Sequence, residues 1–252
     1  MLKLASKDNL NDILAFCQGD LLGTRIGCYC LSYGFDYDFL KIWIDDSQGS
    51  VKTVLAKFYD TITLKTDVES TDEVSDFIAM IGYSTLEMSL EACKSFGFEA
   101  SEIKKAYIFD GKAENLGAVS LNEEYYKQLY ELVSENIPGS FSKTKDSYLS
   151  FLSDLTYKSR RGLARCKGII YDSKLASSVI TSAETENSAL LSAVACSIES
   201  RGKGFGKATV LTMTDELIKE GKIVFVTALN ASAEGFYEKI GFRFYDYISI
   251  IR

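Results

Sequence analysis

The stretch that decides the fold is Arg201-Gly202-Lys203-Gly204-Phe205-Gly206-Lys207. An apolar run of small residues, 189–196, precedes it and predicts a strand, and apolar residues at helical spacing over 208–220 predict a helix behind it. Three glycines in this loop let the main chain approach a ligand closely, because no Cβ stands in the way. The helix start offers unpaired N–H groups and the positive end of the helix dipole. The stretch therefore predicts a phosphate-binding loop.

Two common phosphate-binding loops do not fit this spacing. The nucleoside-triphosphate loop, G-x-x-x-x-G-K-[ST], requires a glycine where Arg201 stands and a hydroxyl residue where Ala208 stands. The dinucleotide fingerprint, G-x-G-x-x-G, requires a glycine at Lys207. The ligand is therefore expected to be neither a nucleoside triphosphate in a P-loop nor a dinucleotide.

The pattern that fits is Arg-x-x-Gly-x-Gly, and residues further along the chain extend it. A second apolar strand, 223–229, is followed by Asn230 and by a predicted helix, 231–240, which carries Phe236-Tyr237 and ends at Gly241-Phe242. Over about 60 residues this order resembles the acetyl-CoA-binding half of the GNAT superfamily of N-acetyltransferases, and it is also similar to the FR47-like branch.

The predicted elements of residues 102–252 agree with this resemblance. They are a strand at 105–109, helices at 123–136 and 145–158, a hairpin of 165–171 with 175–183, and then 188–197 (strand), 205–220 (helix), 223–229 (strand), 231–240 (helix) and 242–251 (strand). The order β-α-α-β-β-β-α-β-α-β is that of a GNAT domain. We therefore expect an α/β (α+β) protein with a C-terminal GNAT fold, in which helices flank a mixed, mostly antiparallel central sheet. Residues 139–144 lie where the family varies to shape the acceptor pocket.

The resemblance implies an acetyl-CoA-dependent N-acetyltransferase, in which a primary amine of a small-molecule acceptor attacks the CoA thioester directly. The loop would bind the diphosphate, and the backbone of the preceding strand would pair with the pantetheine arm and polarise the thioester carbonyl. The implied cofactor-binding residues are Val194, Cys196, Arg201, Gly202, Lys203, Gly204, Phe205, Gly206, Lys207 and Asn230.

The resemblance also assigns Tyr237 as the general acid. A phenol with a pKa of about 10 can protonate a thiolate whose acid has a pKa of about 8.5, if it lies within hydrogen-bond reach. The chain has no histidine, which excludes a histidine base and the Ser-His-Asp and H-E-x-x-H sites. A base must then be a carboxylate or a water held by one, and Glu184 is the candidate, ahead of Glu186 in the same predicted turn.

Each of these residues also has a structural interpretation. Tyr237 would fit the apolar core of a helix face, and Glu184 and Glu186 would fit a solvated turn. Cys196 is more typical of a small buried hydrophobic residue than of a nucleophile.

Composition narrows the class of protein. The net charge of −7 argues against nucleic acid or an anionic membrane as the main partner. The six cysteines form no common metal-binding pattern and are typical of free thiols in a reducing compartment. No run of about 18 apolar residues occurs, and the N-terminus lacks the apolar run of a signal peptide. We therefore expect a cytoplasmic protein without a metal site.

Residues 1–101 are acidic, whereas residues 102–252 are nearly neutral, so we place a domain boundary between them. Strands are predicted at 39–44, 51–58 and 61–66, and a helix is predicted to begin at 71–73. The segment 89–98, which ends in Gly97-Phe98, echoes 235–242. The hypothesis is a smaller α/β domain that is a degenerate GNAT-like half, shaping the acceptor site or the contact of a homodimer. The alternative is an unrelated helix that ends in Gly-Phe, which is common.

Two functions remain open at this point. The first is an N-acetyltransferase. The second is a non-catalytic CoA-binding module that acts as a sensor or scaffold, since no base is obvious. The acceptor amine, for which amino acids, polyamines, aminoglycosides and protein N-termini are all candidates, and the length of the acyl chain also remain open.

Overall fold

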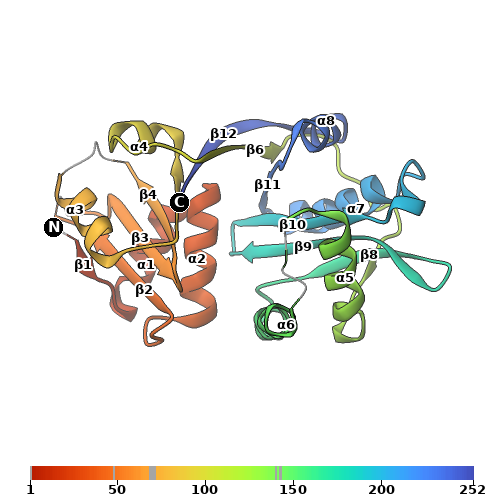
Figure 1. Ribbon diagram of the computed structural model, residues 1–252, viewed down its shortest axis with the longest axis horizontal. Helices are drawn as coiled ribbons and strands as arrows, with labels where there is room; N and C mark the ends of the chain where they lie inside the picture. The colour runs from red at the N-terminus through yellow and green to blue at the C-terminus, as the bar shows by residue number, and fades with distance from the viewer. Residues whose placement is uncertain (1, 48, 68–71, 140, 142–143) are drawn as a thin grey trace. The chain divides into compact units, whose positions relative to one another are not determined.

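The computed structural model describes residues 2–252 except 48, 68–71, 140 and 142–143 (Figure 1). The chain forms two compact units. The first unit consists of Met1–Tyr107, Thr227–Gly235 and Phe244–Arg252, and the second consists of Ile108–Val226 and Phe236–Arg243. The sequence predicts a single boundary between residues 101 and 102. In the structure, two segments near the C-terminal end, 227–235 and 244–252, also belong to the first unit.

The first unit is a sheet with helices on both faces. Its elements are β1 (Lys3–Leu4), α1 (Leu10–Cys17), α2 (Leu21–Tyr33), β2 (Leu40–Asp45), β3 (Thr53–Phe58), β4 (Thr61–Thr66), α3 (Asp72–Ile81), β5 (Thr85–Ser89), α4 (Leu90–Ser95) and the start of β6 (Glu102–Phe109). The strand order is β1-β2-β3-β4-β5-β12, where β12 is Phe242–Ile251. Neighbouring strands are antiparallel except β4 and β5, which are parallel.

Alternation along β3 builds the two faces of this sheet. Val54 and Ala56 pack in one core cluster with Ile13 of α1 and Ile26 of α2. Leu55, between them, packs in a second cluster that contains the buried residues of α3 and α4. Successive side chains of a strand point to opposite faces, so one strand supplies both cores.

The second unit has the same plan. Its elements are β7 (Val119–Ser120), α5 (Tyr126–Asn136), α6 (Lys145–Ser159), β8 (Cys166–Tyr171), β9 (Lys174–Glu184), β10 (Ser188–Cys196), α7 (Phe205–Lys219), β11 (Ile223–Thr227) and α8 (Ala231–Lys239), the last of which is shared between the units. The strand order is β11-β10-β9-β8-β7, antiparallel except for the parallel pair β10 and β11. Short 3₁₀ helices occur at Lys7–Asn9, Glu123–Tyr125 and Ile198–Ser200.

The same order of helices and strands occurs twice along the chain. Elements β1 to β6 and elements β7 to β12 both run β-α-α-β-β-β-α-β-α-β, and the parallel pair, β4 with β5 or β10 with β11, holds the same place in each. The strand–helix–strand order that the repeat hypothesis requires of residues 1–100 is therefore present. One element differs from expectation. The strand predicted at 105–109 is β6, which closes the first repeat, and β7 opens the second.

The last strand of the chain completes the sheet of the first unit. Ile248 in β12 lies opposite Ser89 in β5, and Ile251 lies opposite Leu86. A sequence read along the chain cannot show this, because strand pairing is set by partners that are distant in sequence. No helix among the described residues is long and apolar enough to cross a membrane.

Candidate functional site

A β-bulge in β10 opens one edge of that strand. β10 pairs with β11 only from Ser188 to Leu191. Its register on β9 shifts between Leu190 and Leu191 and again between Ser192 and Ala195, and Ala193 has a φ of 49°. A bulge bends its strand and ends regular pairing, and bulges are frequent next to active sites. Beyond Leu191 the edge of β10 that faced β11 can therefore pair with an extended ligand.

The glycine-rich loop follows at the end of this strand. Gly202 has a φ of 79° and Gly204 a φ of 81°, both in the left-handed region that favours glycine. Gly204 is the N-cap residue of α7 and has no side chain to cap the helix. The amides of Phe205, Gly206 and Lys207 begin the helix, so they have no acceptor four residues earlier. The start of α7 is thus built to receive an acceptor from outside the helix.

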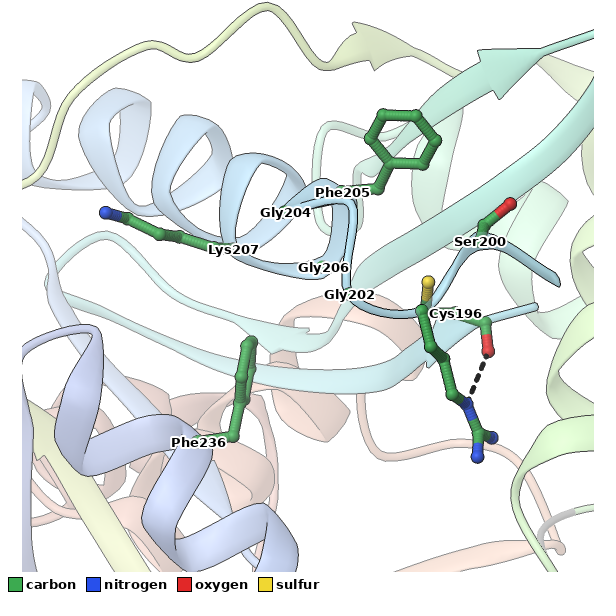
Figure 2. A pocket seen from close by; sticks show the side chains of 9 residues that line it. Cys196, Ser200, Gly202, Gly204, Phe205, Gly206, Lys207 and Phe236 are labelled. Atoms are coloured by element: carbon green, nitrogen blue, oxygen red, sulfur yellow. Dashed lines mark hydrogen bonds between the residues drawn. The ribbon is translucent and has the colours of Figure 1, made fainter. Parts of the chain in front are cut away.

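The loop lines a pocket of about 370 Å³ (Figure 2). Its lining residues are Cys196, Ser200, Arg201, Gly202, Gly204, Phe205, Gly206, Lys207 and Phe236, all in the second unit. Figure 2 shows the ring of Phe236, from α8, facing the loop, and a Cβ placed on Gly206 would lie 3.7 Å from its Cζ. Two of the lining side chains are cationic and none is acidic. The pocket is therefore suited to an anion.

Cys196 has the properties of a neutral, half-buried thiol. Burial raises its pKa, and Arg201, the Gly206 amide and Lys203 partly offset that effect. Its carbonyl oxygen accepts a hydrogen bond of 3.5 Å from Nε of Arg201, which ties the loop to the end of β10. This agrees with a residue that contributes its backbone rather than a nucleophilic sulfur.

Tyr237 is buried next to the pocket. It is 6% exposed, and its ring centroid lies 5.3 Å from that of Phe236 and 5.6 Å from that of Phe242. Burial raises its pKa well above the ordinary value, so the phenol stays protonated. A protonated phenol can donate a proton or a hydrogen bond but cannot act as a base.

Glu184 lies in a different place from the one expected of a base. It is 1% exposed and accepts hydrogen bonds from Arg165, at 2.5 and 3.1 Å, while Lys222 lies 3.3 Å away. It stands opposite Ala189 in the β9–β10 ladder. Ala189 and Ala195 are six positions apart in β10, about 20 Å along a strand. Glu184 thus belongs to an ion cluster at the far end of the strand, where two cations already neutralise its carboxylate, and this placement argues against a role as the base.

The remaining expected site residues are placed as follows. Val194 is half-buried and lies within the bulged part of β10, between Ser192 and Ala195. Glu186 is exposed, as in an ordinary turn. Asn230 lies in the first unit, where its Oδ1 accepts a hydrogen bond of 3.0 Å from the amide of Ala233 at the start of α8. Of the variable segment 139–144, residues 140, 142 and 143 lie outside the described part of the chain. No group of three or more potential ligands suited to a metal occurs among the described residues.

The first repeat differs from the second at the equivalent of the bulge. β4 runs beside β3 without a shift from Thr61 to Thr66. Counted from the first parallel pair of each repeat, Lys65 corresponds to Ser192. Nζ of Lys65 lies 3.8 Å from Asp20, 3.6 Å from Asp67 and 4.7 Å from the ring centroid of Phe16. In the first unit an ion cluster thus stands at the position that corresponds to the bulge, a difference that the sequence pattern did not reveal.

Comparison with known proteins agrees with this geometry. Residues 168–249 match the family model described as FR47-like protein. Among curated protein sequences none matches this chain.

Solved structures are similar over nearly the whole length. A GNAT-family acetyltransferase from Colwellia psychrerythraea is 12% identical, with a TM-score of 0.61, and the match covers 99% of this chain and 98% of that one. A tandem GNAT protein from the clavulanic acid biosynthesis pathway, solved without AcCoA, is 14% identical, with a TM-score of 0.60 and coverages of 99% and 97%. A Drosophila protein is 12% identical, with a TM-score of 0.65 and coverages of 99% and 98%. The whole chain therefore has the fold of the GNAT acetyltransferases, and residues 168–249 are similar to the FR47-like family.

Proposed function

We propose that the protein is an acetyl-CoA-dependent N-acetyltransferase that transfers the acyl group of a CoA thioester to a primary amine of a small molecule. The observation that carries this proposal is the continuity of the bulged β10 and the glycine loop. The strand beyond Leu191 offers a free backbone edge and leads directly into a cationic pocket at the start of α7. A ligand with an extended chain at one end and a diphosphate at the other would fit both the strand edge and the pocket.

The acyl-CoA supplies an activated carbonyl and a thiol leaving group. The amides at the start of α7 hold the diphosphate, with Arg201 and Lys207 providing counter-charge. The backbone at Val194 and Cys196 pairs with the pantetheine arm and orients the thioester carbonyl. An N–H donated to that carbonyl stabilises the negative charge that develops on its oxygen during attack. Tyr237, kept protonated by burial, delivers the proton to the departing sulfur, and the phenolate regains a proton as the acceptor nitrogen releases one on amide formation.

The attacking amine has to lose its proton before the bond forms. None of the side chains that line the described pocket is a carboxylate, and Glu184 is held in its ion cluster. We therefore assign no protein base. The free amine comes from its own acid–base equilibrium in water, and the rate is expected to follow the fraction of unprotonated acceptor.

The test is thiol release from acetyl-CoA with a panel of primary amines. Tyr237→Phe should lower kcat by about 100-fold or more, in the range found for loss of general acid catalysis, with little change in the affinity for CoA. Tyr126→Phe is the matched control, because Tyr126 is 3% exposed and its hydroxyl bonds Ser159 between α5 and α6. Equal turnover by the Tyr237→Phe variant and the wild type would rule out the assigned acid.

The alternative is a non-catalytic CoA-binding module that acts as a sensor or scaffold. The observation that favours it is the lack of a carboxylate among the described lining residues of the pocket. Calorimetry with CoA, run beside the turnover assay, separates the two functions. Tight binding of CoA without thiol release on any amine would favour the module, whereas release that depends on an amine would establish the enzyme.

A further inference from the structure

The hairpin of β8 and β9 brings an exposed aromatic ring to the glycine loop. Its two-residue turn, Asp172-Ser173, has φ values of 49° and 62°, and Tyr171 pairs with Lys174 across it. Two successive residues with positive φ are typical of a tight type I′ turn, which fixes the ends of both strands. Tyr171 is therefore rigidly placed at the end of β8, although it is 44% exposed.

Lys203 of the loop is held over this ring. Its Nζ lies 4.5 Å from the ring centroid of Tyr171, and the ring of Phe205 lies 5.4 Å from the same centroid. A lysine side chain is long and flexible, so an exposed ammonium ordinarily samples many positions. A cation–π contact narrows that range and orients the charge.

Lys203 also stands apart from its neighbours in the loop. Every other residue from Ser200 to Lys207 lines the pocket, whereas Lys203 does not. Lys203 and Phe205 both contact the ring of Tyr171. In Figure 2 the ring of Phe205 points away from the side of the loop that Phe236 faces. The ammonium of Lys203 thus lies outside the cavity that the diphosphate would fill, on the side of the hairpin.

We propose that Tyr171 and Lys203 form a subsite for a phosphomonoester, the 3′-phosphate on the ribose of CoA, with Tyr171 as the positioning residue for the ammonium. This inference rests on the proposed function. A phosphomonoester carries close to two negative charges at pH 7 and presents three acceptor oxygens. The ribose follows the diphosphate in CoA, so this group leaves the pocket next to the loop. Because Lys203 is pre-oriented, it can bind the phosphate with less loss of side-chain freedom.

The experiment is calorimetry with CoA and with 3′-dephospho-CoA, which differ only in this group. The wild type should bind CoA about tenfold more tightly, as expected for one charge-assisted contact at an exposed site. Lys203→Met should reduce that ratio to about one by weakening CoA alone. Tyr171→Leu should reduce the ratio severalfold, and Tyr171→Phe, which keeps the ring, should restore it. Lys207→Met is the contrasting variant and should weaken both ligands equally, because Lys207 lines the diphosphate pocket.

Three results would overturn the subsite. A wild type that binds both ligands equally has no such site. A ratio that Lys203→Met and Tyr171→Leu leave unchanged assigns the preference to other residues. Equal weakening of both ligands by Tyr171→Leu would mean that the ring stacks on the adenine instead. In each of these cases CoA still binds and the proposed function stands, whereas no binding of either ligand by the wild type would remove both.

Discussion

Two glycines of the loop, Gly204 and Gly206, should respond in opposite ways to substitution by alanine. Gly204 has a φ of 81°, which costs an L-residue roughly 1–2 kcal/mol. A Cβ on Gly204 would meet no atom within 4 Å, so the cost is one of backbone conformation alone. Gly204→Ala should therefore lower the free energy of unfolding by about that amount.

Gly206 differs because it lies within α7 and its φ is not positive. A Cβ there would make an ordinary contact with Phe236, at 3.7 Å from Cζ. Replacing a helical glycine by alanine restricts the unfolded chain and gains roughly 0.5–1 kcal/mol. The two variants should thus differ by about 2 kcal/mol although they carry the same added methyl group two residues apart.

Thermal unfolding without ligand measures this difference. About 2 kcal/mol corresponds to a separation of roughly 4–8 °C in Tm for a chain of this size, with Gly204→Ala below the wild type and Gly206→Ala at or above it. Equal Tm values for the two variants would refute the left-handed conformation of Gly204. Gly204→Val, which would block CoA by its bulk, should also destabilise the fold through the same positive φ.

Three further outcomes follow from the geometry. Glu184→Gln should lower the free energy of unfolding by about 3 kcal/mol, because Arg165 and Lys222 lose a buried counter-charge. The kcat per folded molecule should stay unchanged. A large fall in kcat with an unchanged Tm would instead make Glu184 the base. Turnover should rise with pH as the acceptor amine deprotonates, and it should show no fall below about pH 10, because burial raises the pKa of Tyr237. The stability linked to this phenol should decline only above that pH. A fall in turnover near pH 8 would contradict the assignment of Tyr237 as the acid. Calorimetry should find one CoA per chain, since the ion pairs of Lys65 stand at the position in the first repeat that corresponds to the bulge, and two equivalent sites would disprove that interpretation.

Strong local patterns make much of this fold predictable. The strands predicted at 61–66 and 242–251 have the observed bounds of β4 and β12, because each is a short β-rich run between clear breaks. The glycine loop is equally clear, since glycines between a strand and a helix start allow both the left-handed turn and the close approach of a phosphate. The structure of each of these elements is determined by a few neighbouring residues.

Other features depend on partners that are distant in sequence. Helix α2, Leu21–Tyr33, is not predicted, because nine of its 13 residues are buried and it lacks a polar face to give an amphipathic pattern. Gly23 in α2 approaches α1 so closely that a Cβ would lie 2.2 Å from the carbonyl oxygen of Cys17. The partners of Glu184 are hidden from the sequence for the same reason: Arg165 lies just before β8, the other strand of the hairpin, and Lys222 lies beyond α7.

Strand β12 is the last element of the second repeat but pairs with β5 of the first. The two repeats therefore depend on each other, although only the second carries the glycine loop. Ile248, Ile250 and Ile251 are buried in the strand that pairs with β5, and Ile251 packs in the core cluster of α3 and α4. A fragment of residues 102–252 would keep the whole glycine loop but lose β5, so it would expose this apolar strand and its unpaired edge. We expect such a fragment to aggregate, and co-expression with residues 1–101 to restore a soluble complex. A soluble, monomeric fragment with a sharp thermal transition would show that the second repeat folds alone, and that the first contributes to function rather than to the integrity of the sheet.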